Sequence, residues 1–128
     1  MEKPFSQWNY LKQELDDSKR LPTFNEREVW WCSIGVNVGF EVFGEGHGFW
    51  RPVLLLNKHN RHTFHGLPLG STVKPGSRHH FYLEFNDRPG SVMLSQGRTM
   101  SSKRLSNIMG TLPESTFESI RDAYRELV

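Results

Sequence analysis

The sequence lacks the features that mark secreted, disulfide-bonded and membrane-spanning proteins. It contains a single cysteine, Cys32, which cannot form a disulfide within the chain. Its apolar runs are short, as at Val53–Leu56, whereas a membrane-spanning helix needs about 18 consecutive apolar residues. The N-terminal residues Met1–Phe5 do not provide the apolar core of a secretory signal. We therefore expect a cytoplasmic protein that makes no contact with a membrane.

Several catalytic motifs are also missing. The sequence contains no Gly-x-Ser-x-Gly, the motif of the nucleophile elbow in α/β-hydrolases. The glycines between positions 35 and 48 match neither the phosphate-binding loop of nucleotide hydrolases nor the dinucleotide-binding fingerprint. Cys32 lies in an aromatic, strand-like segment, which favours a small buried apolar residue over a nucleophile. We infer that the chain is neither a serine hydrolase nor a nucleotide-binding protein.

The histidines raise the question of a metal site. His59, His62 and His65 are spaced by three, but no Cys-x-x-Cys or His-Glu-x-x-His accompanies them. Their surroundings are strand-like, and residues three apart on a strand point to opposite faces of a sheet. We therefore expect histidines that face solvent or a nucleic acid, and no metal ion or other cofactor.

The net charge of +2 is unevenly distributed along the chain. Residues 1–28 carry five basic and six acidic side chains, and residues 113–128 carry two and four. Residues 29–112 carry nine basic and four acidic side chains together with all six histidines. A basic centre between mildly acidic ends suits a polyanionic partner, although a bias of this size also occurs in proteins without one.

The first half of the chain reads as one helix followed by strands. Trp8, Leu11 and Leu15 have helical spacing within Ser6–Lys19, with Ser6 as a possible N-cap. Residues 28–34 are rich in β-branched and aromatic side chains, which predicts a strand. Residues 35–48 contain five glycines and predict a long loop, which in a small domain suggests a functional or mobile segment. Further strands are predicted at 52–57 and 63–69.

The second half contains shorter elements. The alternation in residues 79–85 predicts a strand, and residues 91–94 predict another. Turns are expected at 74–77 and 87–90. Leu105, Ile108 and Met109 have helical spacing, which predicts a short helix that Ser101 or Ser102 caps and Gly110 ends. A final helix is expected after a capping box formed by Thr111 and Glu114; its apolar side comprises Phe117, Ile120, Tyr124 and Leu127.

These elements define the expected fold class. Five or so short strands occur with a few helices and without alternation of strand and helix. A chain of 128 residues also has the size of one domain. The pattern therefore predicts a mostly β protein of the α+β class, a small antiparallel barrel with peripheral helices.

The remaining candidates for chemistry are polar residues at predicted strand ends. These residues are Arg51, Ser71, Gln96 and Arg98. Arg51 follows the glycine-rich loop and precedes an apolar strand, which would place it at the rim of the barrel. Its guanidinium could bind phosphate oxygens in a bidentate manner, or Arg51 could be an ordinary surface residue.

These residues belong to segments that together resemble the MazF/PemK toxin family. The matching segments, in family order and spacing, are residues 28–31, 51–56, 66–71, 91–99, 102–105 and 110–113. The resemblance covers a barrel domain at residues 28–128 and leaves residues 1–27 as an N-terminal helical extension. It implies an SH3-like barrel of the MazF/CcdB type, usually a homodimer.

The resemblance also implies a function. Such toxins belong to type II toxin–antitoxin systems, inhibit growth by cleaving single-stranded mRNA without a metal, and are neutralised by a cognate antitoxin. The ribose 2′-hydroxyl attacks the adjacent phosphate, leaving a 2′,3′-cyclic phosphate and a 5′-hydroxyl. The family pattern gives the main catalytic role to Arg51 and RNA contacts to Gln96 and Arg98, and structural hydrogen bonding is the alternative role for the latter two. Trp30 or Trp31 could stack on a base, and we assign this role to Trp31.

One departure from the family pattern affects catalysis. Gly70 stands where these toxins usually carry a threonine whose hydroxyl assists at the phosphate, so we expect only backbone contact with RNA there. Ser71 follows and could replace the hydroxyl if the chain bends at Gly70, since one step along a strand reverses the side chain. Gly97 replaces a bulky apolar residue and could loosen the packing beneath Gln96.

Two functions therefore remain open. The first is an active endoribonuclease toxin, with Arg51 and Ser71 as catalytic residues. The alternative is a catalytically weakened toxin-like barrel that binds RNA or an antitoxin peptide without cleaving. A gyrase poison on the same barrel fits less well, because the segments around Arg51 and Arg98 resemble the ribonuclease branch.

Overall fold

A computed structural model describes residues 3–19, 21–35, 44, 49–71 and 76–128. Most of the predicted loop at 35–48, and half of the predicted turn at 74–77, lie outside the described residues. The elements are α1 (Phe5–Asp17), β1 (Glu28–Ser33), β2 (Trp50–Lys58), β3 (Thr63–Gly70), β4 (His80–Phe85), β5 (Arg88–Met93), η1 (Leu94–Gln96), β6 (Arg98–Ser101), η2 (Ser102–Arg104), β7 (Leu105–Thr111) and α2 (Glu114–Leu127).

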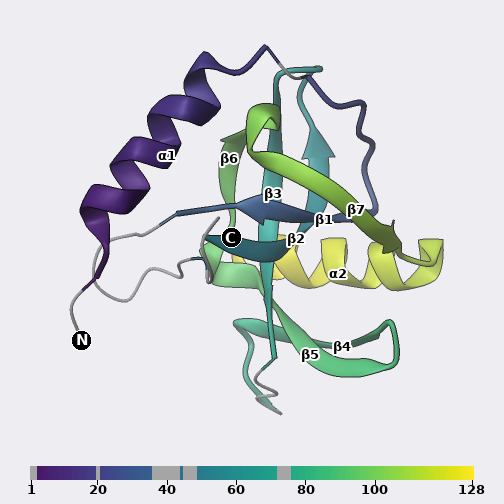
Figure 1. Ribbon diagram of the computed structural model, residues 1–128. Coiled ribbons are helices and arrows are strands. Elements are labelled where there is room, and N and C mark those ends of the chain that lie inside the picture. Colours follow the sequence, from purple (N-terminus) through teal and green to yellow (C-terminus); the bar gives the residue numbers. More distant parts are fainter. Residues whose placement is uncertain (1–2, 20, 36–43, 45–48, 72–75) are drawn as a thin grey trace.

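The strands form one seven-stranded sheet in the order β4-β5-β3-β2-β1-β7, and β6 pairs with β3. Each of these pairings is antiparallel. Figure 1 shows α2 crossing behind the sheet, α1 along its side and the β4–β5 hairpin projecting below. The predicted mostly β class with peripheral helices is confirmed. Among the described residues, however, the hydrogen-bonded order ends at β4 and at β7, so the sheet curves without closing into a barrel.

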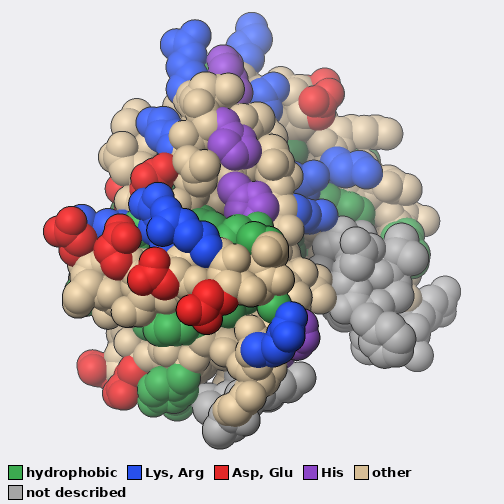
Figure 2. Space-filling model, turned by 180° about the vertical axis from the view of Figure 1, so that it is seen from behind, with side chains coloured by type: hydrophobic (Ala, Val, Ile, Leu, Met, Phe, Trp, Pro, Cys, Tyr) green, Lys and Arg blue, Asp and Glu red, His purple; other side chains and the backbone are tan. Residues whose placement is uncertain are grey.

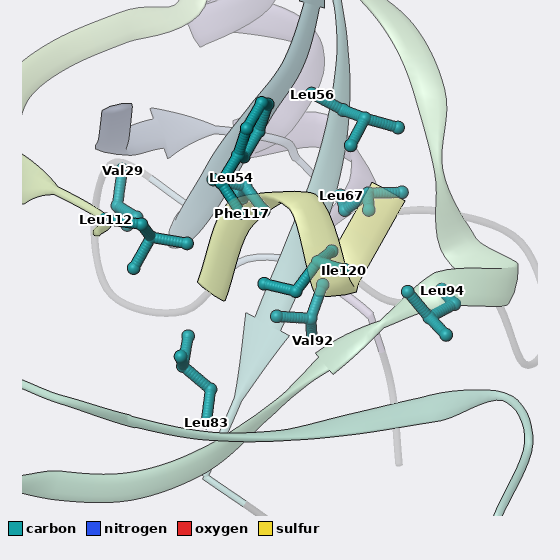
Figure 3. Packing of buried hydrophobic residues seen from close by; sticks show 10 residues of the cluster. All are labelled: Val29, Leu54, Leu56, Leu67, Leu83, Val92, Leu94, Leu112, Phe117 and Ile120. Atoms are coloured by element: carbon teal, nitrogen blue, oxygen red, sulfur yellow. The ribbon is translucent and has the colours of Figure 1, made fainter. Parts of the chain in front are cut away.

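The strand β2 is buried on both faces, which explains its uninterrupted apolar run. Val53 and Leu55 belong to one buried cluster, and Leu54 and Leu56 belong to a second cluster on the other face. The second cluster joins the sheet to α2 and is drawn in Figure 3; its members are Val29, Leu54, Leu56, Leu67, Leu83, Val92, Leu94, Leu112, Phe117 and Ile120. The sheet is thereby fixed from both sides along its central strand.

The two helices occur as predicted, although neither begins with the predicted cap. In α2, Phe117 and Ile120 are buried against the sheet, as their spacing predicted. Pro113 occupies its N-cap position and Thr111 lies in β7, so the predicted capping box is wrong. Similarly, Pro4 precedes α1, and Ser6 lies inside the helix. Among the described residues, we find no helix with the length and apolar character needed to cross a membrane.

The predicted short helix after Ser101 is wrong, because residues 105–111 form strand β7 after a single 3₁₀ turn. β7 pairs with β1, and the register of this pairing shifts twice. One shift lies on each side of the pair formed by Trp30 and Ile108. Each shift adds residues to β7 and breaks the alternation of its side chains. The resulting spacing of Leu105 and Ile108 resembles that of a helix.

The β4–β5 connection is tighter than predicted. Asn86 and Asp87 have φ angles of 52° and 61°, which is the conformation of a two-residue type I′ hairpin turn. Arg88–Gly90, expected in the turn, belong to β5. The strand β6 had not been predicted.

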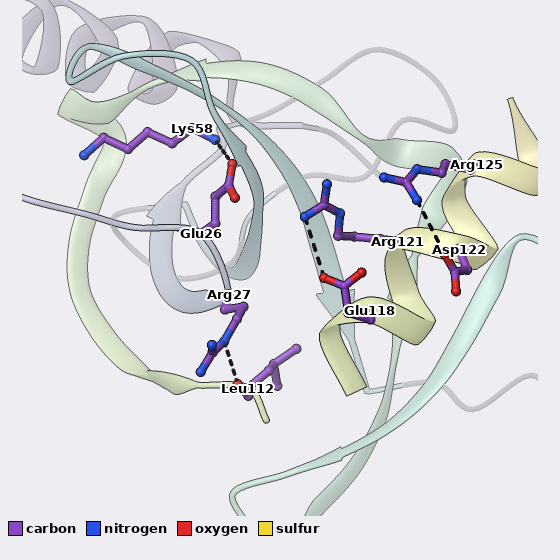
Figure 4. A network of polar contacts seen from close by, with 8 residues as sticks. All are labelled: Glu26, Arg27, Lys58, Leu112, Glu118, Arg121, Asp122 and Arg125. Atoms are coloured by element: carbon purple, nitrogen blue, oxygen red, sulfur yellow. Dashed lines mark hydrogen bonds and ion pairs between the residues drawn. The ribbon is translucent and has the colours of Figure 1, made fainter. Parts of the chain in front are cut away.

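Polar contacts fix the segment before β1 to the rest of the domain (Figure 4). The Lys58 amide donates to Glu26 Oε2 at 3.0 Å, and the Arg27 Nε donates to the Leu112 carbonyl at 3.2 Å. The two pairs on α2, Glu118–Arg121 and Asp122–Arg125, lie at the surface and contribute little to stability.

Cys32 is fully buried in β1, and burial raises the pKa of its thiol from 9.0 to about 12. The neighbouring guanidiniums of Arg104 and Arg98 oppose this shift but do not overcome it. Thiolate is the reactive form, so we expect Cys32 in the native protein to react with a thiol reagent at pH 8 at least about 10³-fold more slowly than in the unfolded chain. Labelling followed by mass spectrometry measures this rate. Fast native labelling would contradict the burial of Cys32.

His65 links the sheet to α2 and gives the fold a pH dependence. Its Nε2 lies 3.0 Å from the Tyr124 hydroxyl. Burial lowers the pKa of His65 below 6.5, and the charge of His59 lowers it further by a smaller amount. As the pH falls below 6.5, the unfolded chain binds this proton more readily than the folded one, so folding stability is lost. Urea titrations at pH 7.5 and 5.0 should show this loss. We expect it to be smaller in His65→Asn and unchanged in His62→Gln, which replaces an exposed histidine.

Candidate functional site

A groove of about 1160 Å³ lies between the two ends of the curved sheet. Residues of β1, β2 and β3 form its floor, the β4–β5 hairpin forms one wall and β7 forms the other. The lining residues are Trp31, Trp50, Arg51, Pro52, Leu69, Gly70, Ser71, Leu83, Phe85, Asn86, Arg88, Pro89, Gly90, Ser91, Ser106, Asn107 and Met109.

The lining combines positive charge, hydroxyl groups and aromatic rings. Arg51 and Arg88 supply two guanidiniums, and no carboxylate or imidazole occurs among the described lining residues. Three serines and two asparagines supply neutral hydrogen-bonding groups, while Trp31, Trp50 and Phe85 supply aromatic faces. Guanidiniums bind phosphate oxygens, and aromatic faces stack on unpaired bases. The groove therefore has the chemistry of a site for a single-stranded nucleic acid.

Arg51 enters the groove from the beginning of β2. Antiparallel pairing places this end of β2 beside the end of β3, with Val53 opposite Pro68. The Arg51 Nη1 donates to the Leu69 carbonyl at 3.1 Å, and the side chain is half-buried. This hydrogen bond directs the guanidinium toward the Gly70 end of β3.

Gly70 lies directly beside this guanidinium. A Cβ atom added at Gly70 would stand 3.8 Å from Arg51 Nη1 and 3.2 Å from Met93 Cε. Gly70 pairs with Ser91 in a regular strand and is not among the described glycines with positive φ. Neither its backbone conformation nor a backbone clash requires glycine here. The first atom of a side chain at position 70 would therefore stand within van der Waals distance of the Arg51 guanidinium.

Ser71 lies just beyond the end of β3, is exposed and lines the same groove. β5 passes close to this step of the chain, because a Cβ atom at Gly90 would lie 2.6 Å from the Gly70 carbonyl oxygen. Gly90 thus allows β5 to approach the Gly70–Ser71 step and form a wall of the groove. Both predicted catalytic residues, Arg51 and Ser71, therefore line one groove.

The two adjacent tryptophans of β1 point in opposite directions. Trp30 is 7% exposed, belongs to the core, and donates from Nε1 to Glu28 Oε1 at 3.0 Å. Trp31 is half-buried and lines the groove. Trp31 is therefore the tryptophan of this pair that a ligand in the groove would meet.

Gln96 and Arg98, the other predicted RNA contacts, are not among the lining residues of the groove. Gln96 ends η1, and Arg98 begins β6 and donates from Nη2 to the Ile34 carbonyl at 2.9 Å. Their contact with RNA stays a prediction, and it would require RNA to extend beyond the groove toward the end of β1.

Gly97 does not loosen the packing, and that expectation is wrong. A Cβ atom at Gly97 would lie 2.6 Å from Leu67 Cδ2 and 2.8 Å from His65 Nε2. Glycine at this position allows the chain between η1 and β6 to approach β3 closely. A bulky side chain here would require β3 or His65 to move.

Most residues of the groove walls were not predicted from the sequence. Arg88 and Asn86 come from the β4–β5 hairpin, and Ser106 and Asn107 come from β7, which had been predicted as a helix. Arg88 was the one residue of this group with a readable signal, a basic side chain in the predicted turn. The positions of the others depend on the curvature of the sheet.

Several of the described histidines lie on another face of the molecule. Figure 2 shows several of them in a column above α2, with Lys and Arg side chains near its upper end. Among the described residues, no three or more His, Cys, Asp or Glu side chains are grouped so that they could hold a metal ion.

Fold and groove together define a small antiparallel β protein with a cationic, aromatic-lined site. Comparison with protein families matches residues 25–128 to the PemK-like, MazF-like toxin of type II toxin–antitoxin systems. The chain therefore belongs to this toxin family.

Solved structures share the fold at low sequence identity. MazF from Deinococcus radiodurans (Form-I) is 18% identical, with a TM-score of 0.63, and the match covers 85% of this chain and 97% of that one. The Mycobacterium tuberculosis toxin MazF-mt6 is 18% identical, with a TM-score of 0.58 and coverages of 78% and 94%. A mycobacterial endoribonuclease in complex with its cognate antitoxin is 16% identical, with a TM-score of 0.59 and coverages of 81% and 93%. No curated protein gives a significant match.

Proposed function

We propose that this protein is a cytoplasmic endoribonuclease toxin that cleaves single-stranded RNA without a metal ion. The observation that carries this proposal is the Arg51 guanidinium, held by the Leu69 carbonyl in a groove whose described lining contains no carboxylate. Family membership and the endoribonuclease named among the structural neighbours support the same activity.

The groove suits a reaction within the RNA backbone. The 2′-hydroxyl oxygen forms a bond to the adjacent phosphorus, and the bond from phosphorus to the 5′-oxygen breaks. The 2′-hydroxyl gives up its proton and the departing 5′-oxygen gains one, so the products are a 2′,3′-cyclic phosphate and a 5′-hydroxyl. Negative charge builds up on the phosphate oxygens in the transition state, where Arg51 can stabilise it.

The other lining residues position the RNA. Arg88, on the wall opposite β7, can bind a neighbouring phosphate, and Trp31 and Trp50 offer faces for stacking of unpaired bases. Ser71 supplies a hydroxyl at the end of β3 near the expected position of the scissile phosphate. We assign Ser71 to binding or polarising that phosphate in the absence of a threonine at position 70.

An antitoxin is the expected protein partner. Two structural neighbours are described as an endoribonuclease with its cognate antitoxin and as MazE–MazF from Deinococcus radiodurans. For this chain we propose that an acidic, flexible antitoxin segment occupies the cationic groove and excludes RNA. We also propose that the toxin is a homodimer, which sedimentation of the purified protein can test.

One observation favours a second function. Gly70 provides no hydroxyl beside Arg51, and loss of one transition-state donor commonly lowers a rate by ~10²–10³. The chain could then bind RNA or an antitoxin peptide without cleaving it.

A cleavage assay separates these functions. Purified protein is incubated with a long single-stranded RNA in EDTA, and the product ends are analysed by mass spectrometry. The endoribonuclease predicts discrete fragments with 2′,3′-cyclic phosphate and 5′-hydroxyl ends. RNA that is bound but remains intact supports the binding function, and 5′-phosphate ends contradict the proposed chemistry.

A further inference from the structure

The helix α1 packs its buried aromatic residue against the point where the chain enters β2. Trp8 and Phe49 are 5% and 6% exposed, and their rings meet edge-to-face at 5.6 Å with an interplanar angle of 65°. Leu11 and Leu15 pack around this pair. The helix precedes residue 25, where the family match begins. Trp8 therefore lies outside the part of the chain that matches the family, whereas Phe49 lies inside it.

Phe49 is held in an unfavourable backbone conformation. Its φ angle is 53°, in the left-handed region that residues with a Cβ atom rarely adopt. Its carbonyl oxygen accepts from the Ile34 amide at 3.1 Å and from the Gly35 amide at 3.4 Å. Such a conformation persists only when surrounding contacts fix it. The Trp8 ring and the two amides provide those contacts.

Trp8 also contacts the chain just after β1. A side chain at Gly35, whose φ angle is 82°, would overlap the Trp8 indole, so the ring lies directly on this backbone. The Arg104 guanidinium stands 5.5 Å from the Trp8 ring and donates from Nη1 to the Ser33 carbonyl at 3.1 Å. One indole therefore packs against both the chain that leaves β1 and the chain that enters β2.

This junction leads directly to the proposed catalytic arginine. Phe49 is followed by Trp50 and Arg51, which pair with Ser33 and Cys32 of β1 and line the groove. We infer that Trp8 is a positioning residue for Arg51, acting through Phe49 and Trp50 without touching RNA itself. The inference rests on the proposed function, because it takes Arg51 as catalytic.

Substitution of Trp8 provides the kinetic test. We expect Trp8→Ala to lower kcat for RNA cleavage about 10- to 100-fold and to change KM less than about threefold, since a small displacement of a catalytic group affects mainly the reaction step. Trp8→Phe keeps an aromatic ring against Phe49 and should recover most of kcat. Tyr10→Ala removes an aromatic residue that is 67% exposed on the same helix, and it should change neither constant.

Hydrogen exchange gives a readout that does not depend on cleavage. The Ile34 and Gly35 amides donate to Phe49, so Trp8→Ala should speed their exchange at least about tenfold. Amides of the β3–β6 ladder should keep their wild-type rates. Ile120→Val destabilises the core beside α2 and controls for a general loss of stability, so it should leave kcat and these two amides unchanged. If Trp8→Ala does not fold, Trp8→Leu takes its place.

The outcomes distinguish this inference from the proposed function. Unchanged exchange at Ile34 and Gly35 in Trp8→Ala would overturn it, as would a fall in kcat that Ile120→Val reproduces. If the wild type cleaves no RNA, the proposed function fails. Faster exchange at these amides then still supports the Trp8 contact as the device that fixes the entry to β2, and unchanged exchange rejects it.

Discussion

Arg51→Ala is expected to lower kcat/KM for RNA cleavage by at least ~10³. The side chain places a permanent positive charge in the groove, and a single neutral donor to a transition-state oxyanion is already worth ~10²–10³. Single-turnover cleavage of a defined RNA oligonucleotide measures the loss. Arg51→Lys should recover only a small part, because an ammonium cannot reproduce the planar, bidentate fork.

Arg88→Ala is the matched control, since it removes the other guanidinium of the groove. We expect Arg88→Ala to weaken RNA binding and to make the RNA affinity less dependent on salt. The single-turnover rate at saturating protein should change less than about tenfold. Circular dichroism establishes that each variant is folded. Equal losses in Arg51→Ala and Arg88→Ala would assign Arg51 to binding alone, and an unaffected Arg51→Ala would exclude the proposed role.

Gly70→Thr is expected to raise the cleavage rate about 10- to 100-fold. The added Cβ atom would stand 3.8 Å from Arg51 Nη1, so a threonine rotamer that turns its hydroxyl toward the guanidinium would add a hydroxyl group beside it. Its closest contact would be the Met93 Cε at 3.2 Å, the end of a flexible side chain that can move. Threonine also suits a strand. The substitution therefore adds a donor at little structural cost.

Gly70→Val separates the hydroxyl from the bulk of the side chain. Valine has nearly the shape of threonine, so it should fold equally well and give no increase in rate. A gain in both variants would attribute the effect to packing around Arg51, and a gain in neither would show that the groove does not use a hydroxyl at position 70. Ser71→Ala should lower the wild-type rate and have less effect in Gly70→Thr if Ser71 now supplies the hydroxyl.

Much of the fold follows from local patterns in the sequence. The buried strand β2, the aromatic strand β1 and the apolar side of α2 were predicted because each obeys a simple period. β7 follows no simple period, because its two register shifts against β1 gave Leu105 and Ile108 the spacing of a helix. The pairing that decides its conformation joins residues far apart in the sequence, such as Cys32 and Leu105, which are 73 positions apart, and no local pattern encodes it.

The candidate site, like the fold, was predicted from the sequence only in part. Arg51, Gly70 and Ser71 were assigned to one site because the family resemblance gives these positions roles in the same reaction. Trp31 was assigned to the site although no sequence pattern separates it from Trp30, and the structure places Trp31 in the groove and Trp30 in the core. The walls from β5 and β7, and the Trp8–Phe49 contact, arise from the curvature of the sheet and the docking of α1.

The central claim is that the groove presents the RNA 2′-hydroxyl to its own phosphate beside Arg51. The most direct test uses an oligonucleotide with a single cleavage site whose attacking ribose is replaced by 2′-deoxyribose. We predict that the protein binds this oligonucleotide about as tightly as the unmodified RNA, leaves it intact, and yields a 2′,3′-cyclic phosphate from the unmodified strand. Cleavage of the deoxy-substituted oligonucleotide at the same bond would contradict this account.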